Sequence, residues 1–220
     1  MIATRQKDFE DILEALEDYS SVYIVGCGDC ATVLQTGGEY EVAEMAEKLQ
    51  AQGKEITGQN VPDVTCQVLD TKRLLRQDRD IIEKTDAVLV LACGSGIQAV
   101  ADSLPETPVV AGLDTTFQAD KFRGGQFYEW CSGCGECVVD QFLGVCPVTR
   151  CPKGQLNGPC GGCEDGKCEV DPERDCVWAL IYERIDALGD PKGVTKDIVE
   201  PKDFQKASPP REYVFEPRRG

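Results

Sequence analysis

Cysteine is the residue type in this sequence whose number and spacing point most directly to chemistry. The chain has thirteen cysteines in 220 residues, and nine of them fall between Cys131 and Cys176. Residues 1–10 are too highly charged for a signal peptide, so we expect a reducing compartment in which thiols do not form disulfides. Dense cysteines in such a chain predict metal ligation, in a segment that depends on its metal for folding.

The absence of histidine narrows the kind of metal site that the chain can form. Without imidazole ligands, there are no mixed cysteine and histidine zinc fingers, Rieske centres or histidine-ligated haem groups. A Cys-His dyad and a Ser-His-Asp triad are excluded for the same reason, and no catalytic residue is predicted. The chemistry that remains is that of all-cysteine metal sites.

Four cysteines in the first half of the chain lie in loops after predicted strands. Cys27 and Cys30 form a Cys-x-x-Cys pair after the first strand, Cys66 follows the second strand region, and Cys93 follows the third. Because ligands in open parallel sheets gather beyond the carboxyl ends of the strands, these cysteines predict one four-thiolate site. Two alternatives stay open: Cys66 and Cys93 as small buried residues, or Cys27 and Cys30 as a thioredoxin-like redox pair. No Gly-x-Gly-x-x-Gly follows the first strand, so a nicotinamide site is not expected.

The second half of the chain holds a denser group of cysteines. Its predicted ligands are Cys131, Cys134, Cys137, Cys146, Cys151, Cys160, Cys163 and Cys168, with the role of Cys176 left open. The run Cys131-x-x-Cys134-x-x-Cys137, with a distal Cys146-Pro147, resembles the spacing of bacterial ferredoxins. We therefore predict two to three [4Fe-4S] clusters in the whole chain. Zinc at one site is the alternative, because two Cys-x-x-Cys pairs also make a tetrahedral four-thiolate site.

The elements that position these cysteines follow from the hydrophobic pattern. Short apolar runs predict strands over residues 21–26, 54–58, 87–92 and 107–113. Helical spacing of apolar residues predicts helices over residues 9–19, 41–52, 74–84 and 97–104. Strands that alternate with helices indicate an α/β fold with a doubly wound parallel sheet over residues 1–120.

The pattern changes after this α/β domain. Residues 121–125 are predicted to be a linker into a small irregular, cysteine-rich iron-sulfur domain over residues 121–190, with one helix from Pro172 to Leu188. Residues 191–220 are rich in proline and charge, which predicts an extended tail. Its aromatic residues Phe204, Tyr213 and Phe215 favour a tail that lies against this protein or a partner.

Net charge argues against nucleic acid as a partner, and hydropathy argues against insertion into a membrane. The formal net charge of −16 is unsuited to nucleic acid, whose phosphates require a basic surface. No run approaches the roughly 18 apolar residues of a membrane-spanning helix. We therefore expect a cytoplasmic protein without membrane insertion.

One long motif carries a resemblance to a known family. It reads Cys146-Pro147-Val148-Thr149-Arg150-Cys151-Pro152-Lys153-Gly154-Gln155-Leu156-Asn157-Gly158-Pro159-Cys160-Gly161-Gly162, followed by Gly166-Lys167-Cys168-Glu169. The motif resembles the methylenetetrahydrofolate reductase C-terminal domain family. Standalone proteins with this domain include the small iron-sulfur subunit of the two-subunit reductase that acetogenic bacteria use in the methyl branch of carbon fixation.

The resemblance implies a role and a partner. The partner would be a flavoprotein TIM-barrel subunit that reduces methylenetetrahydrofolate to methyltetrahydrofolate, because this chain is too short for a barrel of about 250 residues. The chain itself would hold no flavin and would pass electrons from an upstream donor, such as ferredoxin or a heterodisulfide-reductase-like module. Two other interpretations stay open: a zinc-stabilised structural scaffold subunit, and an iron-sulfur subunit of another low-potential redox complex.

Overall fold

The computed structural model describes residues 1–212 and divides the chain into two compact units. The first unit is Met1–Tyr128, and the second begins at Glu129. Within the described residues, no helix has the length and apolar character needed to cross a membrane.

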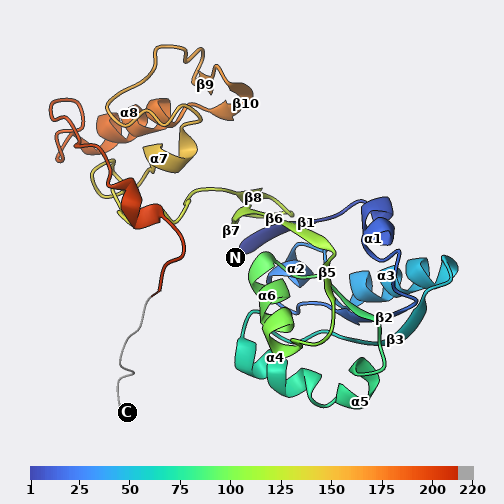
Figure 1. The fold of residues 1–220 in the computed structure, drawn as a ribbon. Coiled ribbons are helices and arrows are strands. Elements are labelled where there is room, and N and C mark those ends of the chain that lie inside the picture. Colours follow the sequence, from blue (N-terminus) through green and yellow to red (C-terminus); the bar gives the residue numbers. More distant parts are fainter. Residues whose placement is uncertain (213–220) are drawn as a thin grey trace. The chain divides into compact units, whose positions relative to one another are not determined.

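The centre of the first unit is a four-stranded parallel sheet in the order β3-β2-β4-β5 (Figure 1). The strands are β2 (Ser21–Val25), β3 (Glu55–Asn60), β4 (Ala87–Val90) and β5 (Val109–Ala111). Every residue of β2 and β4 is buried, as expected for apolar strands in the middle of a sheet that is covered on both faces. The parallel sheet predicted from the apolar runs is confirmed.

Six helices belong to the same unit. They are α1 (Phe9–Ala15), α2 (Cys30–Val33), α3 (Glu39–Ala51), α4 (Val68–Leu75), α5 (Arg79–Ile82) and α6 (Gly94–Ser103). Helix α3 begins where the Glu41 carboxylate accepts the backbone N–H of Gly38 at 2.9 Å, which satisfies one of the free N–H groups of the first turn. The chain crosses from β2 to β3 through α3 and returns past β2 to β4 through α4 and α5. Right-handed crossovers in these two directions place their helices on opposite faces of the sheet.

The predicted helix over residues 74–84 is wrong in its extent. Helix α4 ends at Leu75, and the short helix α5 begins only at Arg79. Between them, the Asp78 carboxylate accepts hydrogen bonds from the Tyr23 hydroxyl at 2.5 Å and the Asn60 amide at 3.3 Å. These bonds to β2 and β3 hold the chain against the sheet, and a continuous helix would break them.

Four further strands in the first unit were not predicted. They are β1 (Ile2–Gln6), β6 (Leu113–Gln118), β7 (Asp120–Lys121) and β8 (Phe127–Tyr128). β1 pairs with β6 and β7 with β8, both antiparallel, so part of the segment expected to be a linker is a two-stranded ribbon. Apart from Ala3 and Leu113, which are buried, their residues are polar or only partly buried. Such strands lack the apolar run by which strands are found in a sequence.

The second unit contains little regular structure. Its elements are α7 (Pro147–Arg150), β9 (Lys167–Cys168), β10 (Asp171–Asp175), α8 (Val177–Leu188) and the 3-10 helix η1 (Phe204–Ala207). Its small apolar core centres on α8, where Trp178 packs edge to face on Phe142 with 5.8 Å between ring centroids. The predicted start of α8 at Pro172 is wrong, because Pro172 lies in β10, which pairs with β9. Phe204 is exposed in η1, and Tyr213 and Phe215 lie outside the described residues.

Substitution of Leu89 tests the importance of the parallel sheet. Leu89 is fully buried in β4 opposite Ile24 of β2, so Leu89→Ala should lower the free energy of unfolding by about 2–5 kcal/mol. Leu69 in α4 is 83% exposed, and Leu69→Ala should change it by no more than about 0.5 kcal/mol. Urea unfolding followed by far-UV circular dichroism measures both, and equal effects would contradict this description of the core.

Candidate functional site

The first group of cysteines lies at the carboxyl edge of the parallel sheet. Cys27 and Cys30 follow β2, Cys66 follows β3, and Cys93 immediately precedes α6 after β4. Backbone hydrogen bonds of 2.8 Å hold the loop after β2 to two neighbouring segments, from Cys27 N–H to Gly37 and from Gly28 N–H to Pro62. Gly26 is required here, because a Cβ at this position would lie 2.5 Å from the Gly37 carbonyl oxygen.

Electrostatics shows that these thiols affect one another. Burial raises the pKa of Cys66, and the neighbouring thiols of Cys93 and Cys27 raise it further. Burial also raises the pKa of Cys30, whose sulfur lies 3.6 Å from the Asp29 carboxylate and accepts the Ile2 N–H at 3.4 Å. Ionised together, these thiols would repel one another, and a bound metal cation reverses this penalty. The donor set is therefore suited to a cation-bearing group.

The second unit holds the ferredoxin-like run on an irregular loop of residues 131–137, which we call the 131–137 loop. Cys131 and Cys137 are exposed, and Cys134 is partly buried. The Gly133 N–H donates to the Cys131 sulfur at 3.4 Å, which is the kind of backbone donor that stabilises a thiolate. Gly135 has a φ of +78°, and a Cβ there would lie 2.6 Å from the Lys206 carbonyl oxygen. A glycine is needed at position 135 for both reasons.

Thr149 brings the distal Cys146 to the same loop. Its hydroxyl accepts the Ser132 N–H at 3.1 Å, and the Cys146 thiol lies 3.9 Å from the same oxygen. Cys146 is the N-cap residue of α7, and Pro147 begins that helix. Thr149 thus connects helix α7, at whose start Cys146 lies, to Ser132 of the 131–137 loop.

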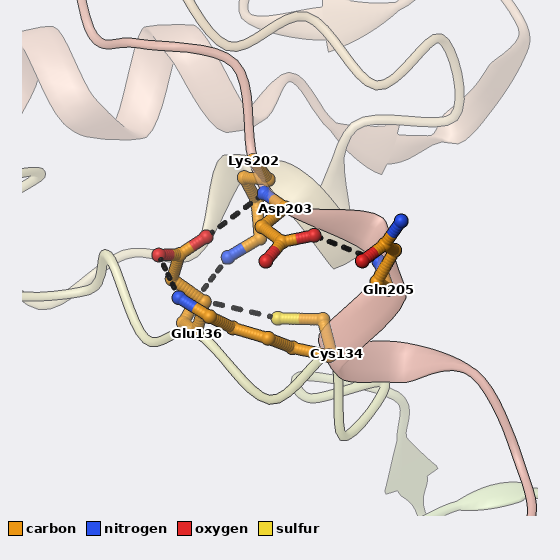
Figure 2. A network of polar contacts seen from close by, with 6 residues as sticks. Cys134, Glu136, Lys202, Asp203 and Gln205 are labelled. Carbon is orange, nitrogen blue, oxygen red and sulfur yellow. Dashed lines mark hydrogen bonds and ion pairs between the residues drawn. The ribbon is translucent and has the colours of Figure 1, made fainter.

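A segment of the tail lies against the 131–137 loop (Figure 2). The Lys202 ammonium donates to the Glu136 carbonyl oxygen, and the Glu136 carboxylate accepts from the Asp203 N–H at 3.0 Å and from Lys206 at 2.7 Å. A hydrogen bond from the Glu136 backbone, and then the Lys202 ammonium, hold the pKa of Cys134 below its usual value against the effect of burial. Arg211 adds a hydrogen bond of 2.7 Å to the Gly133 carbonyl oxygen.

A separate hollow in the second unit is lined by five cysteines. They are Cys151, Cys160, Cys163, Cys168 and Cys176. Lys153 and Glu169 form an ion pair in its wall, and the Cys160 thiol donates to Glu169 at 3.3 Å. Burial and a hydrogen bond with Cys176 raise the pKa of the Cys163 thiol. The hollow brings four predicted ligands together.

Cys176 is the residue of this group that the sequence left unassigned. It is the N-cap residue of α8, and its N–H donates to the Gly166 carbonyl oxygen at 2.7 Å. Its spacing from Cys168 matches no short ligand motif, so the only signal in the sequence was its place directly before the apolar stripe of α8. In the fold, β10 pairs with β9, and this pairing brings Cys176 back to the cysteine-rich segment.

The thiols are gathered in neighbourhoods without forming a closed coordination sphere. All thirteen cysteines are free of disulfides. Among residues 1–212, no three histidine, cysteine, aspartate or glutamate side chains converge closely enough to hold one metal ion. Cys27, Cys30, Cys66 and Cys93 thus share one sheet edge, while the cysteines of the second unit divide between the 131–137 loop with Cys146 and the five-cysteine hollow.

Fold and cysteines together define a two-unit protein with an α/β unit and a small cysteine-rich unit. Residues 110–205, from β5 into η1, match a family model described as "Methylene-tetrahydrofolate reductase C terminal". The match covers just under half of the chain and agrees with the family that the motif resembles. Comparison with curated proteins and with solved structures gave no match.

The contact between Glu136 and the tail should depend on pH in a defined way. Lys206 and the Asp203 N–H lower the pKa of Glu136, so the contact is fully present above the ordinary carboxyl pKa of about 4.3 and is lost only as pH falls below it. Hydrogen-exchange protection of the Asp203 amide should therefore stay constant from pH 8 to pH 5, after correction for intrinsic rates. Glu136→Gln should lower this protection and leave the Leu91 amide, which donates to Val25 in the sheet, unaffected. A decline in protection of the unsubstituted chain within this range would contradict the assignment.

Proposed function

We propose that this chain is the iron-sulfur electron-transfer subunit of a methylenetetrahydrofolate reductase. The observation that carries the proposal is the five-cysteine hollow, which lies inside the segment that matches the reductase family. A redox partner of a reductase needs a redox group, and the chain has no histidine with which to hold haem or a Rieske centre. Thiolate-ligated iron-sulfur clusters are the redox group that its side chains suit.

The number and type of the cysteines in the second unit would suit two clusters. Cys131, Cys134, Cys137 and Cys146 would hold one, because Thr149 connects the distal cysteine to the 131–137 loop. Four of the five cysteines in the hollow would hold the other. The sheet-edge group Cys27, Cys30, Cys66 and Cys93 would hold a third cluster or a zinc ion, for which four-thiolate ligation is equally suitable.

The clusters would accept and release single electrons, while the chain binds and orients them. Backbone N–H groups such as those of Gly133 and Ile2 donate to cysteine sulfurs, and such bonds favour the anionic state of the ligands. Electrons would leave for the flavin of a TIM-barrel partner that reduces methylenetetrahydrofolate to methyltetrahydrofolate. An upstream donor such as ferredoxin or a heterodisulfide-reductase-like module would supply them, and the chain would need no catalytic residue or flavin of its own.

Metal analysis tests this proposal directly. Anaerobically purified chain, alone and with its partners, should contain about eight or more irons per chain and a broad visible absorbance that dithionite bleaches. Flavin should copurify with the partner subunit only. A colourless chain loaded with zinc would contradict the proposal and favour a structural scaffold instead.

Paired cysteine substitutions test the grouping of the ligands. Cys176→Ser and Cys168→Ser should each lose about four irons, and the double variant should lose no more than either, because both would remove the same cluster. Cys134→Ser combined with Cys176→Ser should lose about eight. Additive losses for the Cys168 and Cys176 pair, or full iron in Cys176→Ser, would remove Cys176 from the site.

A further inference from the structure

Two loops carry most of the cysteines of the second unit, and neither contains a helix or a strand. They are the 131–137 loop and residues 151–163, which we call the motif loop. The buried residues of the apolar core all lie outside the two loops: Val138, Phe142, Val145, Val177, Trp178 and Ile181. Apolar burial alone therefore does not fix the loops, and polar contacts must supply the rest.

Asn157 anchors the motif loop to the tail. Its side-chain oxygen accepts the Val199 N–H at 2.7 Å, and its side-chain amide nitrogen donates to the Val199 carbonyl oxygen at 3.0 Å. The pair of hydrogen bonds resembles the exchange between two opposed residues of an antiparallel ladder. An amide side chain is required, because a carboxylate cannot donate and an ammonium cannot accept. Val199 also packs against the apolar core, so this anchor joins the core, the motif loop and the tail.

Glu136 anchors the other loop to the tail a few residues further along (Figure 2). Its backbone carbonyl oxygen accepts from Lys202, and its carboxylate accepts from the Asp203 N–H and from Lys206. The Lys206 carbonyl oxygen lies so close to Gly135 that a side chain at that position would collide with it. The loop is thus held through both its backbone and a side chain.

The two anchor points lie close together on the tail. Glu200 and Pro201 are the only residues between Val199 and Lys202. A segment of this length spans at most about 11 Å, and proline restricts its backbone further. Movement of one loop is therefore transmitted to the other unless an anchor breaks.

We propose that residues 199–206 are a brace that couples the two loops, so that a change that orders or loosens one loop does the same to the other. Asn157 is the fixed point of the brace on the motif loop, and Glu136 is its fixed point on the 131–137 loop. The brace consists of polypeptide contacts alone, so the inference does not depend on the proposed electron-transfer function. It also gives a role to Asn157, a residue of the sequence motif that the cysteine sites do not use.

Hydrogen exchange in the full, anaerobically purified chain tests the coupling at single amides. The Val199 amide reports on the first anchor and the Asp203 amide on the second. Asn157→Ala should lower the protection of the Asp203 amide by about fivefold or more, the lower end of coupling between distinct sites. Glu136→Ala should lower the protection of the Val199 amide by a similar factor, since such coupling is reciprocal.

Two further variants separate coupling from local damage. Lys196→Gln changes an exposed side chain of the same tail and should leave both amides unchanged. A Gly-Ser-Gly-Ser insertion between Glu200 and Pro201 keeps both anchors but lets them move apart. In that background, Asn157→Ala should no longer affect the Asp203 amide. A cross-effect that survives the insertion, or an Asp203 amide that Asn157→Ala leaves unchanged in the original chain, would overturn the inference.

The Leu180 amide, which is hydrogen-bonded in the first turn of α8, monitors the fold of the unit and should keep its protection in every variant. If Asn157→Ala exposes it, the insertion alone decides. The insertion should then lower the protection of the Val199 and Asp203 amides relative to the unsubstituted chain. Loss at Leu180 as well would equally support the coupling, because the insertion removes no side chain. Unchanged protection of the Val199 and Asp203 amides would overturn it.

Discussion

Repulsion between neighbouring thiolates is the constraint on which the rest of this structure depends. Thiols placed close together cannot all ionise unless positive charge is placed among them. Burial raises the pKa of Cys66 and of Cys163, and neighbouring thiols raise it further. The net charge of the chain is −16, which makes further negative charge on the thiols less favourable.

The two units stabilise their cysteine-bearing loops in different ways, with backbone N–H donors in one and with lysine and arginine side chains in the other. At the sheet edge, parallel strands bring the thiols together, and the β1 backbone donates an N–H to Cys30. In the second unit, where the apolar core is small, lysine and arginine side chains hold irregular loops by their carbonyl oxygens. Polar contacts there replace the packing that regular elements provide in the first unit, as expected where few apolar residues are available to bury.

The sequence predicted the parallel sheet and its cysteine-bearing edge because both follow from short apolar runs with defined ends. Helix α3 was also predictable, since Val42, Met45 and Leu49 mark its buried face. The pairing of β1 with β6 could not be predicted, because polar strands carry no alternation that identifies their partner. The break between α4 and α5 depends on a hydrogen bond from Tyr23 to Asp78, which lie 55 residues apart.

For the candidate site, spacing alone predicted Cys131, Cys134 and Cys137 as one group, since a Cys-x-x-Cys pattern is local. The contacts of Cys176 with Gly166 and of Lys202 with Glu136 depend on where the chain returns, and no local pattern encodes such a return. Lys202 is also a residue that hydropathy places on the surface. Only its burial in the fold distinguishes it from the other lysines of the tail.

The separation of Lys202 from its contact on Glu136 has a consequence for biosynthesis. Lys202 stands 66 positions after Glu136, and the chain is made from its N-terminus. The loop that carries Cys134 is therefore complete on the ribosome well before the lysine that covers it has been added. During this interval the loop lacks the hydrogen bonds to Glu136 that the tail supplies in the folded chain.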